Sequence, residues 1–469
     1  MTSNVLASRY ASPEMVAIWD ETAKVSAERR LWVTVLKAQQ SAGLDVDDAV
    51  IDDYRTVIDR VDVDSIRERE RALLHDVKAR IEEFNHLAGH QLIHLGMTSR
   101  DVTENVEQEQ VLRSLEMIRD RAVASLAAMA RVATDTRTQV VTGRTHNVPA
   151  QATTVGKRIA MFGEELLGAV ESLEDLMGRY PLRGIKGPVG TRQDQVELVG
   201  SEGADRIESD VAEALGFRKT ASSVGQIYPR SLDLEVISTL VRLASGPTNL
   251  TTSLRLMAGH DLATEGFREG QVGSSAMPHK MNPRTSERIH GLKVVLGGHL
   301  TMAASLAGEQ WNEGDVACSV VRRVMLPDAF YAADGLFESL LTVLSDVGFF
   351  PAAIEAELYA NLPFLATTRL LGAAVRAGSG REEAHEIIKR HAVASARARR
   401  EHPGDGGLPA RLASDPDFPL DTAGVEAALG EPLSFTGDAA TQVEAFVDSV
   451  AALVERFPEA ARYRPRPLL

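Results

Sequence analysis

The chain has 469 residues, of which 44% are hydrophobic and 5% aromatic, and a formal net charge of −15. This length exceeds what one compact core needs, so we expect two or three domains. The excess of acidic residues excludes nucleic acid and anionic membrane surfaces as expected partners, and the single cysteine, Cys318, excludes an intramolecular disulfide or a cysteine-rich metal site.

Alanine and leucine recur throughout the chain while aromatic residues are scarce, a balance that favours helix over strand. The first residues lack a basic region followed by an apolar stretch, so no secretory signal is predicted. No apolar run reaches the ~20 residues of a membrane-spanning helix. We therefore expect a soluble, cytoplasmic and mostly α protein.

Residues 1–108 are predicted to form an N-terminal domain of shorter, charge-rich helices. Ser12-Pro13-Glu14 is typical of a helix start, with proline at the first helical position. Thr98 and Asp101 have the spacing of a capping box, which predicts a further helix start.

Three histidines in this region recur every four residues: His86, His90 and His94. On a helix they would stack along one face, which makes a metal site a hypothesis. Because histidines at this spacing also occur readily in solvated helices, we predict no metal.

Residues 109–362 are predicted to form a bundle of long helices. Apolar residues recur in steps of three and four along residues 111–129, 155–180 and 289–300, which places one apolar stripe on each helix. No strand-like alternation is found between these stripes. The prediction is three helical domains with a central long-helix bundle. Because apolar stripes of this length often pack between subunits, we also expect an oligomer.

The remaining residues, 363–469, are predicted to form a smaller C-terminal helical domain with a loop at residues 403–419 that is rich in proline, glycine and aspartate. In the central region, the glycines of residues 184–190 do not predict a phosphate-binding loop, because the Gly-Lys-Ser/Thr ending is absent.

The segment GSSAMPHKMNP, residues 273–283, has the composition of a chemically active loop. Glycine and serine give it backbone freedom and amides that can face an anion. Lys280 adds a cation beside a serine hydroxyl, which suits a reaction in which a carboxylate gains charge. A second interpretation is a surface loop that starts a helix, with Asn282 as N-cap, Pro283 as the first helical residue and Glu287 supporting the helix dipole.

This segment resembles the signature loop of the fumarase/aspartase superfamily, GSS-x-M-P-x-K-x-N-P, and its Pro-His-Lys form is similar to that of adenylosuccinate lyases. The resemblance covers the first two predicted domains, and the C-terminal region matches only in general helical character. Further matching motifs are Arg9-Tyr10, His75-Asp76-Val77-Lys78, Thr98-Ser99-Arg100-Asp101, Gly143-Arg144-Thr145-His146, Gln226 with Arg230, and Ser319 through Asp328.

The resemblance implies an anti β-elimination of fumarate without a cofactor. The implied substrates are adenylosuccinate, which gives AMP, and succinylaminoimidazole carboxamide ribotide, which gives AICAR. It also implies a homotetramer in which three subunits contribute to each active site.

For the reaction itself, the resemblance implies Ser274 as the base and His146 as the acid that protonates the leaving nitrogen. Lys280 and Asn282 would stabilise the extra charge on the carboxylate, and Glu287 would orient and polarise the histidine. On local grounds alone, a solvated loop serine and a hydrogen-bonded turn histidine are the commoner situations.

For binding, the resemblance implies a His-Asp pair and a Thr-Ser pair on the fumaryl side, with cations and hydrogen-bonding groups for phosphate and carboxylates. Singly, such residues are more often solvated surface groups. The implied binding residues are His75, Asp76, Thr98, Ser99, Arg9, Tyr10, Gln226, Asn282, Ser319 and Arg323, with Lys280 as a further cation. The resemblance also implies that His75 takes part in catalysis.

Two positions depart from the family pattern. Gly314 stands where a phosphate-side arginine is expected, and Leu74 precedes His75 where many members carry a polar residue. These departures affect the nucleotide side and leave the elimination residues in place.

Three alternatives remain open: another lyase of the superfamily such as argininosuccinate lyase, a carboxymuconate cycloisomerase, and a non-catalytic crystallin-like protein. The last predicts loss of the acid, base or lysine. Because His146, Ser274, Lys280 and Glu287 are all present, the catalytic alternatives are favoured.

Overall fold

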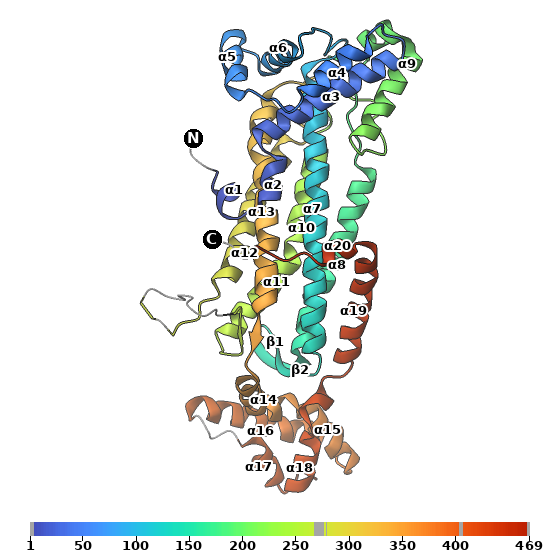
Figure 1. Ribbon diagram of the computed structural model, residues 1–469. Coiled ribbons are helices and arrows are strands. Elements are labelled where there is room, and N and C mark those ends of the chain that lie inside the picture. The colour runs from blue at the N-terminus through green and yellow to red at the C-terminus, as the bar shows by residue number, and fades with distance from the viewer. Residues whose placement is uncertain (1–3, 267–275, 278, 403–406, 467–469) are drawn as a thin grey trace.

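Long helices dominate the computed structural model, which describes residues 4–266, 276–277, 279–402 and 407–466 (Figure 1). The expectation of a mostly α fold is confirmed, and among the described residues no helix has the length and apolarity to span a membrane. The molecule is elongated, with a helical layer at each end of a central bundle.

The layer at the top of Figure 1 contains shorter helices from the N-terminal region. Ser12 begins α2 as predicted, since its hydroxyl accepts the Met15 N–H and proline follows it. The helices of the N-terminal region are α1 (Val5–Arg9), α2 (Pro13–Ile18), α3 (Glu21–Ser41), α4 (Asp48–Thr56), α5 (Val63–Leu73) and α6 (Asp76–Ala88).

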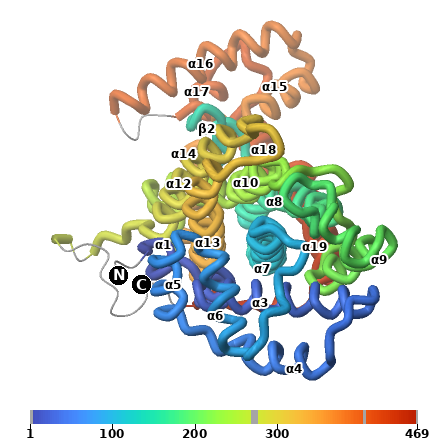
Figure 2. The backbone as a smooth tube through the Cα atoms, turned by 90° about the horizontal axis from the view of Figure 1, so that it is seen from above, coloured from blue at the N-terminus to red at the C-terminus, as the bar shows by residue number. Residues whose placement is uncertain are grey.

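The bundle surrounds α7, which lies near its centre when viewed from above (Figure 2). The predicted apolar stripe of α7 is confirmed, because Val111, Leu115, Ile118 and Leu126 are fully buried. The bundle helices are α7 (Ser99–Asp135), α8 (Val155–Arg179), α10 (Ser231–Leu243), α11 (Ser245–Ala258), α12 (Arg284–Leu306), α13 (Ala317–Asp346), α19 (Ala439–Arg456) and α20 (Pro458–Ala461). The helix α9 (Gln193–Ala214) lies instead in the top layer of Figure 1, packed against α3.

Strands occur where the sequence pattern predicted none. β1 (Val140–Thr145) and β2 (Val148–Thr154) form an antiparallel hairpin between α7 and α8, and β3 (Ala263–Thr264) pairs with β4 (Gly348–Phe349). The register of the hairpin is irregular near Gly143, where a Cβ would lie 2.6 Å from the Gln151 carbonyl oxygen. This irregularity breaks the alternation on which strand prediction depends.

The layer at the bottom of Figure 1 has its own apolar core, with buried residues between Leu370 and Ala428. α19 instead returns to the bundle, where Phe446 packs so closely on Gly163 that an added Cβ would lie 2.3 Å from its ring. The helices of the layer are α14 (Pro351–Leu365), α15 (Thr367–Arg376), α16 (Arg381–Glu401), α17 (Leu408–Ala413), α18 (Thr422–Leu429) and the 3₁₀ helix η1 (Pro432–Phe435). The division at residues 108 and 362 stays a prediction.

Candidate active site

The residues implied by the resemblance fall into three groups along the bundle. The upper cluster, at the top of Figure 1, consists of His75, Asp76, Thr98, Ser99, Gln226, Ser319 and Arg323. A second group lies at the start of α12 and beside α1, and His146 lies alone at the turn of the β1–β2 hairpin.

His75 and Asp76 sit at the start of α6. The His75 Nδ1 accepts the Lys78 N–H at 3.3 Å, so the histidine is the N-cap. Asp76 accepts from Arg323 of α13 at 2.8 Å and from Arg80 at 3.5 Å. Burial alone would raise the pKa of the Asp76 carboxyl, but Arg80, the Val77 N–H and Arg323 outweigh it and lower the pKa below its ordinary 3.8.

Thr98 and Ser99 begin α7 as the capping-box spacing predicted. The Thr98 N–H donates to Asp101 Oδ2 at 2.7 Å. The other carboxylate oxygen of Asp101 accepts the Lys186 and Gly187 N–H groups at 2.8 and 3.0 Å. The glycine-containing loop that follows α8 therefore binds an internal carboxylate through its amides.

Ser319 and Arg323 are one turn apart on α13 and so lie on the same side of that helix. The Ser319 hydroxyl accepts from Arg100 Nη2 of α7 at 2.7 Å. Together with the contact between Arg323 and Asp76, this bond joins α6, α7 and α13, elements that are far apart in the sequence.

Gln226 lies in the loop between α9 and α10, where its N–H donates to the Glu313 carbonyl at 2.7 Å. The neighbouring Gly314 has a φ of +143°, a conformation that favours glycine. A Cβ there would lie 3.1 Å from Ile227. The glycine that departs from the family pattern is therefore suited to the backbone of this chain.

His146 occupies the first position of the two-residue hairpin turn. His146 and Asn147 have φ values of +53° and +59°, the left-handed pair of a type I′ turn. The side chain of His146 is exposed. The adjacent Arg144 is anchored by Glu357 of α14, so the hairpin is held against the bottom layer.

The group beside α12 contains Lys280, Asn282, Glu287, Arg9 and Tyr10. Lys280 and Glu287 are exposed, and the Arg288 guanidinium lies 5.7 Å from the Tyr10 ring centre. Burial lowers the pKa of Arg288, and the nearby Arg9 is among the cations that lower it further. Ser274, the implied base, lies outside the described residues.

The predicted N-cap of this helix was wrong. α12 begins at Arg284 with Pro283 as N-cap, not with Asn282 as cap and Pro283 as the first helical residue. Its free amides are met by Glu265, whose carboxylate accepts the Thr285 and Ser286 N–H groups at 2.8 and 2.7 Å. A cap supplied from a preceding segment leaves no local sequence signal.

The three spaced histidines do not stack on one helix. α6 ends at Ala88 with Gly89 in the left-handed region. His90 then pairs with Asp53 at 2.8 Å, and His94 accepts from the Trp32 indole at 3.0 Å. No cluster of three metal-binding side chains occurs in the described part of the chain.

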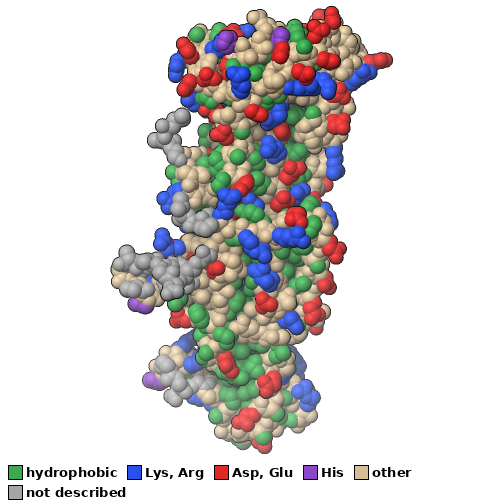
Figure 3. Space-filling view, in the orientation of Figure 1, with side chains coloured by type: hydrophobic (Ala, Val, Ile, Leu, Met, Phe, Trp, Pro, Cys, Tyr) green, Lys and Arg blue, Asp and Glu red, His purple; other side chains and the backbone are tan. Residues whose placement is uncertain are grey.

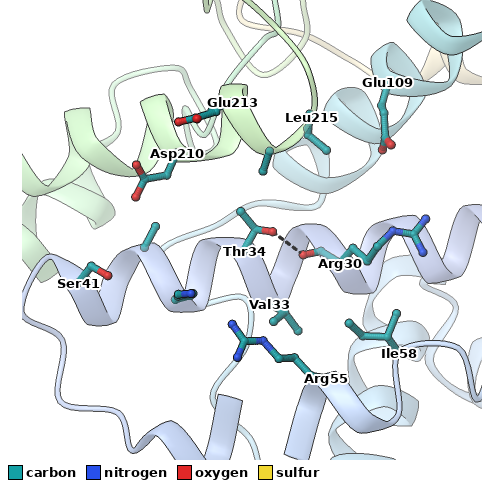
Figure 4. A pocket seen from close by; sticks show the side chains of 13 residues that line it. Arg30, Val33, Thr34, Ser41, Arg55, Ile58, Glu109, Asp210, Glu213 and Leu215 are labelled. Carbon is teal, nitrogen blue, oxygen red and sulfur yellow. Dashed lines mark hydrogen bonds between the residues drawn. The ribbon is translucent and has the colours of Figure 1, made fainter. Parts of the chain in front are cut away.

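Among the cavities formed by the described residues, two show how the implied residues are placed. One, between α3, α4, α7 and α9, is lined by Arg30, Glu109, Glu213 and their neighbours and contains none of the implied residues (Figure 4). The other, of about 340 Å³, adjoins the hairpin turn and is lined by Asn147 and His260, among others. It is therefore the cavity next to the implied acid.

The groups do not meet within one chain. The upper cluster begins at the N-terminal end of α7, whereas the hairpin follows its C-terminal end (Figure 1). Because α7 has 37 residues, these ends are about 55 Å apart. Three further residues that hold these elements were not predicted as functional candidates: Arg80, Arg100 and Glu265. A charged side chain in a helix or loop is usually a solvated surface group, so no local signal marks them.

Comparisons with known proteins agree with this architecture. Residues 9–297 match the family described as Lyase, and residues 363–446 match the family described as Adenylosuccinate lyase C-terminus. The 3-carboxy-cis,cis-muconate lactonizing enzyme from Pseudomonas putida shares the fold at 18% identity and a TM-score of 0.83, with 96% of this chain and 100% of that chain covered. The fold and the first match define an enzyme of the lyase class.

The sequence relatives specify the family further. Adenylosuccinate lyase from Saccharomyces cerevisiae is 33% identical over 94% of this chain and 93% of its own length. Adenylosuccinate lyase from Schistosoma mansoni is 34% identical over 83% of this chain and 82% of its own length. The chain belongs to the adenylosuccinate lyase family. The C-terminal match corrects our expectation that this region resembles the family only in helical character.

Proposed function

We propose that this enzyme eliminates fumarate from adenylosuccinate, giving AMP, and from succinylaminoimidazole carboxamide ribotide, giving AICAR, in purine nucleotide biosynthesis. The observation that carries the proposal is the match to adenylosuccinate lyases along most of the chain. His146, Ser274, Lys280 and Glu287, which the resemblance implies for the elimination, are all present in the sequence.

In the proposed reaction, Ser274 removes the proton beside a carboxylate of the succinyl group. The electron pair moves into that carboxylate, giving an aci-carboxylate that Lys280 and Asn282 stabilise. The pair then returns to form the double bond of fumarate while the carbon–nitrogen bond breaks. His146, oriented by Glu287, donates its proton to the leaving nitrogen.

Binding is assigned to the remaining implied residues. His75, Asp76, Thr98 and Ser99 contact the fumaryl part. Arg9, Tyr10, Gln226, Ser319 and Arg323 bind the nucleotide part and its phosphate. The concentration of arginines around Ser319 supports this assignment, because an anionic substrate needs local cations in a chain of net charge −15.

We further propose that the active site is shared between subunits of a homotetramer. The separation of about 55 Å between the two ends of α7 supports this, because one chain cannot bring His146 to the upper cluster. Exposed apolar residues on α12 and α13, including Val294 at 72% and Val320 at 72%, are suited to subunit packing.

The test is a spectrophotometric assay with both nucleotides, beside argininosuccinate. The proposal expects fumarate from the two nucleotides only. Mixing inactive His75→Asn and His146→Asn proteins should restore activity, since some mixed sites then receive both native histidines. No turnover of either nucleotide by the wild type would overturn the function, and no recovery in mixtures that exchange subunits would overturn the shared site.

A further inference from the structure

A buried ionic cluster lies beneath Ser319. Glu104 of α7 is fully buried and accepts from Arg230 at 2.7 Å, from Arg322 at 3.1 Å and from Arg100 at 3.1 Å. Arg322 also binds Asp233 and Glu107, each at 2.8 Å. The charged members of the cluster are Lys24, Arg100, Arg230, Arg322, Glu104, Glu107 and Asp233.

This cluster contains four cations and three carboxylates, so one positive charge is unmatched within it. Burial would raise the pKa of Glu107, but Lys24 and Arg322 outweigh that effect and lower it, so this carboxylate stays ionised. An excess cation in a poorly solvated place favours a nearby anion. The cluster is therefore suited to support an anion-binding surface.

Arg100 links the cluster to that surface. One of its terminal nitrogens binds Glu104 and the other donates to the Ser319 hydroxyl at 2.7 Å. A guanidinium has no acceptor, so Ser319 must accept in this bond and keeps its own proton for another partner. No acceptor for that proton is found among the described residues.

We propose that Arg100 is a positioning residue that fixes Ser319 as a hydrogen-bond donor toward an anionic oxygen of the substrate. Ser319 and Arg323 then present a hydroxyl and a guanidinium from successive turns of α13 to the same anion. The inference rests on the proposed function, since the anion is the phosphate or a carboxylate of the succinylated nucleotide.

The test is a double-mutant cycle on the purified full chain. Arg100→Met and Ser319→Ala should each raise KM for adenylosuccinate about tenfold and change kcat less than about twofold. Because Arg100 acts through Ser319, the double variant should also show a rise of about tenfold. A rise near a hundredfold would show independent action and overturn the inference.

Lys24→Met is the matched control. It removes one positive charge from the same cluster, through Glu107, without touching Ser319. Its KM should stay within about twofold of the wild type, because Lys24 does not contact Ser319. An equal tenfold rise would mean that the net charge of the cluster sets KM, and it would overturn the positioning role of Arg100. Arg100→Met leaves as many cations as carboxylates in the cluster, which favours folding. If it does not fold, Arg100→Lys takes its place in the cycle, and additivity there also overturns the inference.

Two further measurements separate the possible outcomes. Product inhibition identifies the anion: a weaker inhibition by AMP in Arg100→Met indicates the phosphate, and a weaker inhibition by fumarate indicates a carboxylate. Unchanged inhibition by both products would overturn the inference. A wild-type protein that releases no fumarate overturns the proposed function together with this inference, whereas an active wild type with an additive cycle overturns the inference alone.

Discussion

The two ends of α7 hold their histidines in opposite ways. At the upper end, His75 caps α6, and its neighbour Asp76 is bound by two arginines from α6 and α13. At the lower end, His146 projects from a hairpin turn and is exposed. In the first arrangement, the contacts of His75 and Asp76 come from helices of one chain. The second provides the backbone conformation, and within the described ranges of the chain no side-chain hydrogen bond orients the His146 imidazole.

This difference indicates which parts of the active site a single subunit can form. A network such as the upper cluster needs only helices that pack side by side in the monomer. An acid placed on a turn can be directed by groups from another subunit, and Glu287 is proposed for that role. Figure 3 shows charged side chains of both signs distributed along the face in view, so no single dominant charged patch marks the site there.

The largest expected effect comes from removing the imidazole while keeping the turn. His146→Asn should lower kcat by about 10²- to 10⁴-fold, because the proposed acid is lost. Asparagine tolerates a positive φ better than most residues, so the hairpin should remain and the melting temperature should change little. Steady-state kinetics and thermal melting measure the two quantities.

Asn147→Gly is the control for this experiment. It keeps a residue suited to the type I′ turn and should retain near wild-type kcat. If His146→Asn kept most of its activity, the hairpin turn would not carry the acid. The difference between the two ends of α7 would then have no bearing on catalysis.

A smaller effect is expected from the upper cluster. Asp76→Asn removes the charge that binds Arg323 and Arg80, and we expect kcat/KM to fall about ten- to a hundredfold, since the arginine is no longer held. Glu82→Gln is the matched control on α6, because its pairs with Arg69 and Lys78 are long, at 3.9 and 3.6 Å. It should stay within about twofold. Equal effects of the two variants would contradict a special role for Asp76.

The third prediction concerns the support of Arg9 and Tyr10. A Cβ on Gly335 of α13 would lie 2.8 Å from Tyr10 Cβ and 2.9 Å from its carbonyl oxygen, so Gly335→Ala must displace the segment after α1. We expect KM to rise a few-fold and stability to fall by about 1–3 kcal/mol. Gly168→Ala, in α8 with no atom within 4 Å, is the control and should be neutral or stabilising.

Kinetics and denaturant unfolding of both glycine variants measure these effects. An unchanged KM in Gly335→Ala, despite lower stability, would mean that the position of Tyr10 does not matter for binding. That result would restrict the binding function to the upper cluster.

The helices were predictable where the cause is local. The apolar stripe of α7 follows from its spacing, and the start of α2 follows from Ser12 and the proline after it. The hairpin was missed because Gly143 interrupts its pairing and because His146-Asn147 is not a standard turn pair. The resemblance named Asp76 and Ser319, but their partners lie on other helices, and no local pattern encodes such contacts.

The smallest predicted effect is a pH dependence at the upper end. Burial lowers the pKa of His94 from 6.5 to about 4, and its Nδ1 accepts from Trp32. Because the unfolded chain takes up the proton first, the contribution of the neutral imidazole to stability is present above pH 6.5 and is lost as pH falls toward 4.

His94→Asn should flatten the fall of melting temperature across this window by a few degrees. His86→Asn, at an exposed histidine on α6, should leave it unchanged. If both variants kept the wild-type slope, the half-buried His94 would not be the group that makes the melting temperature depend on pH in this window.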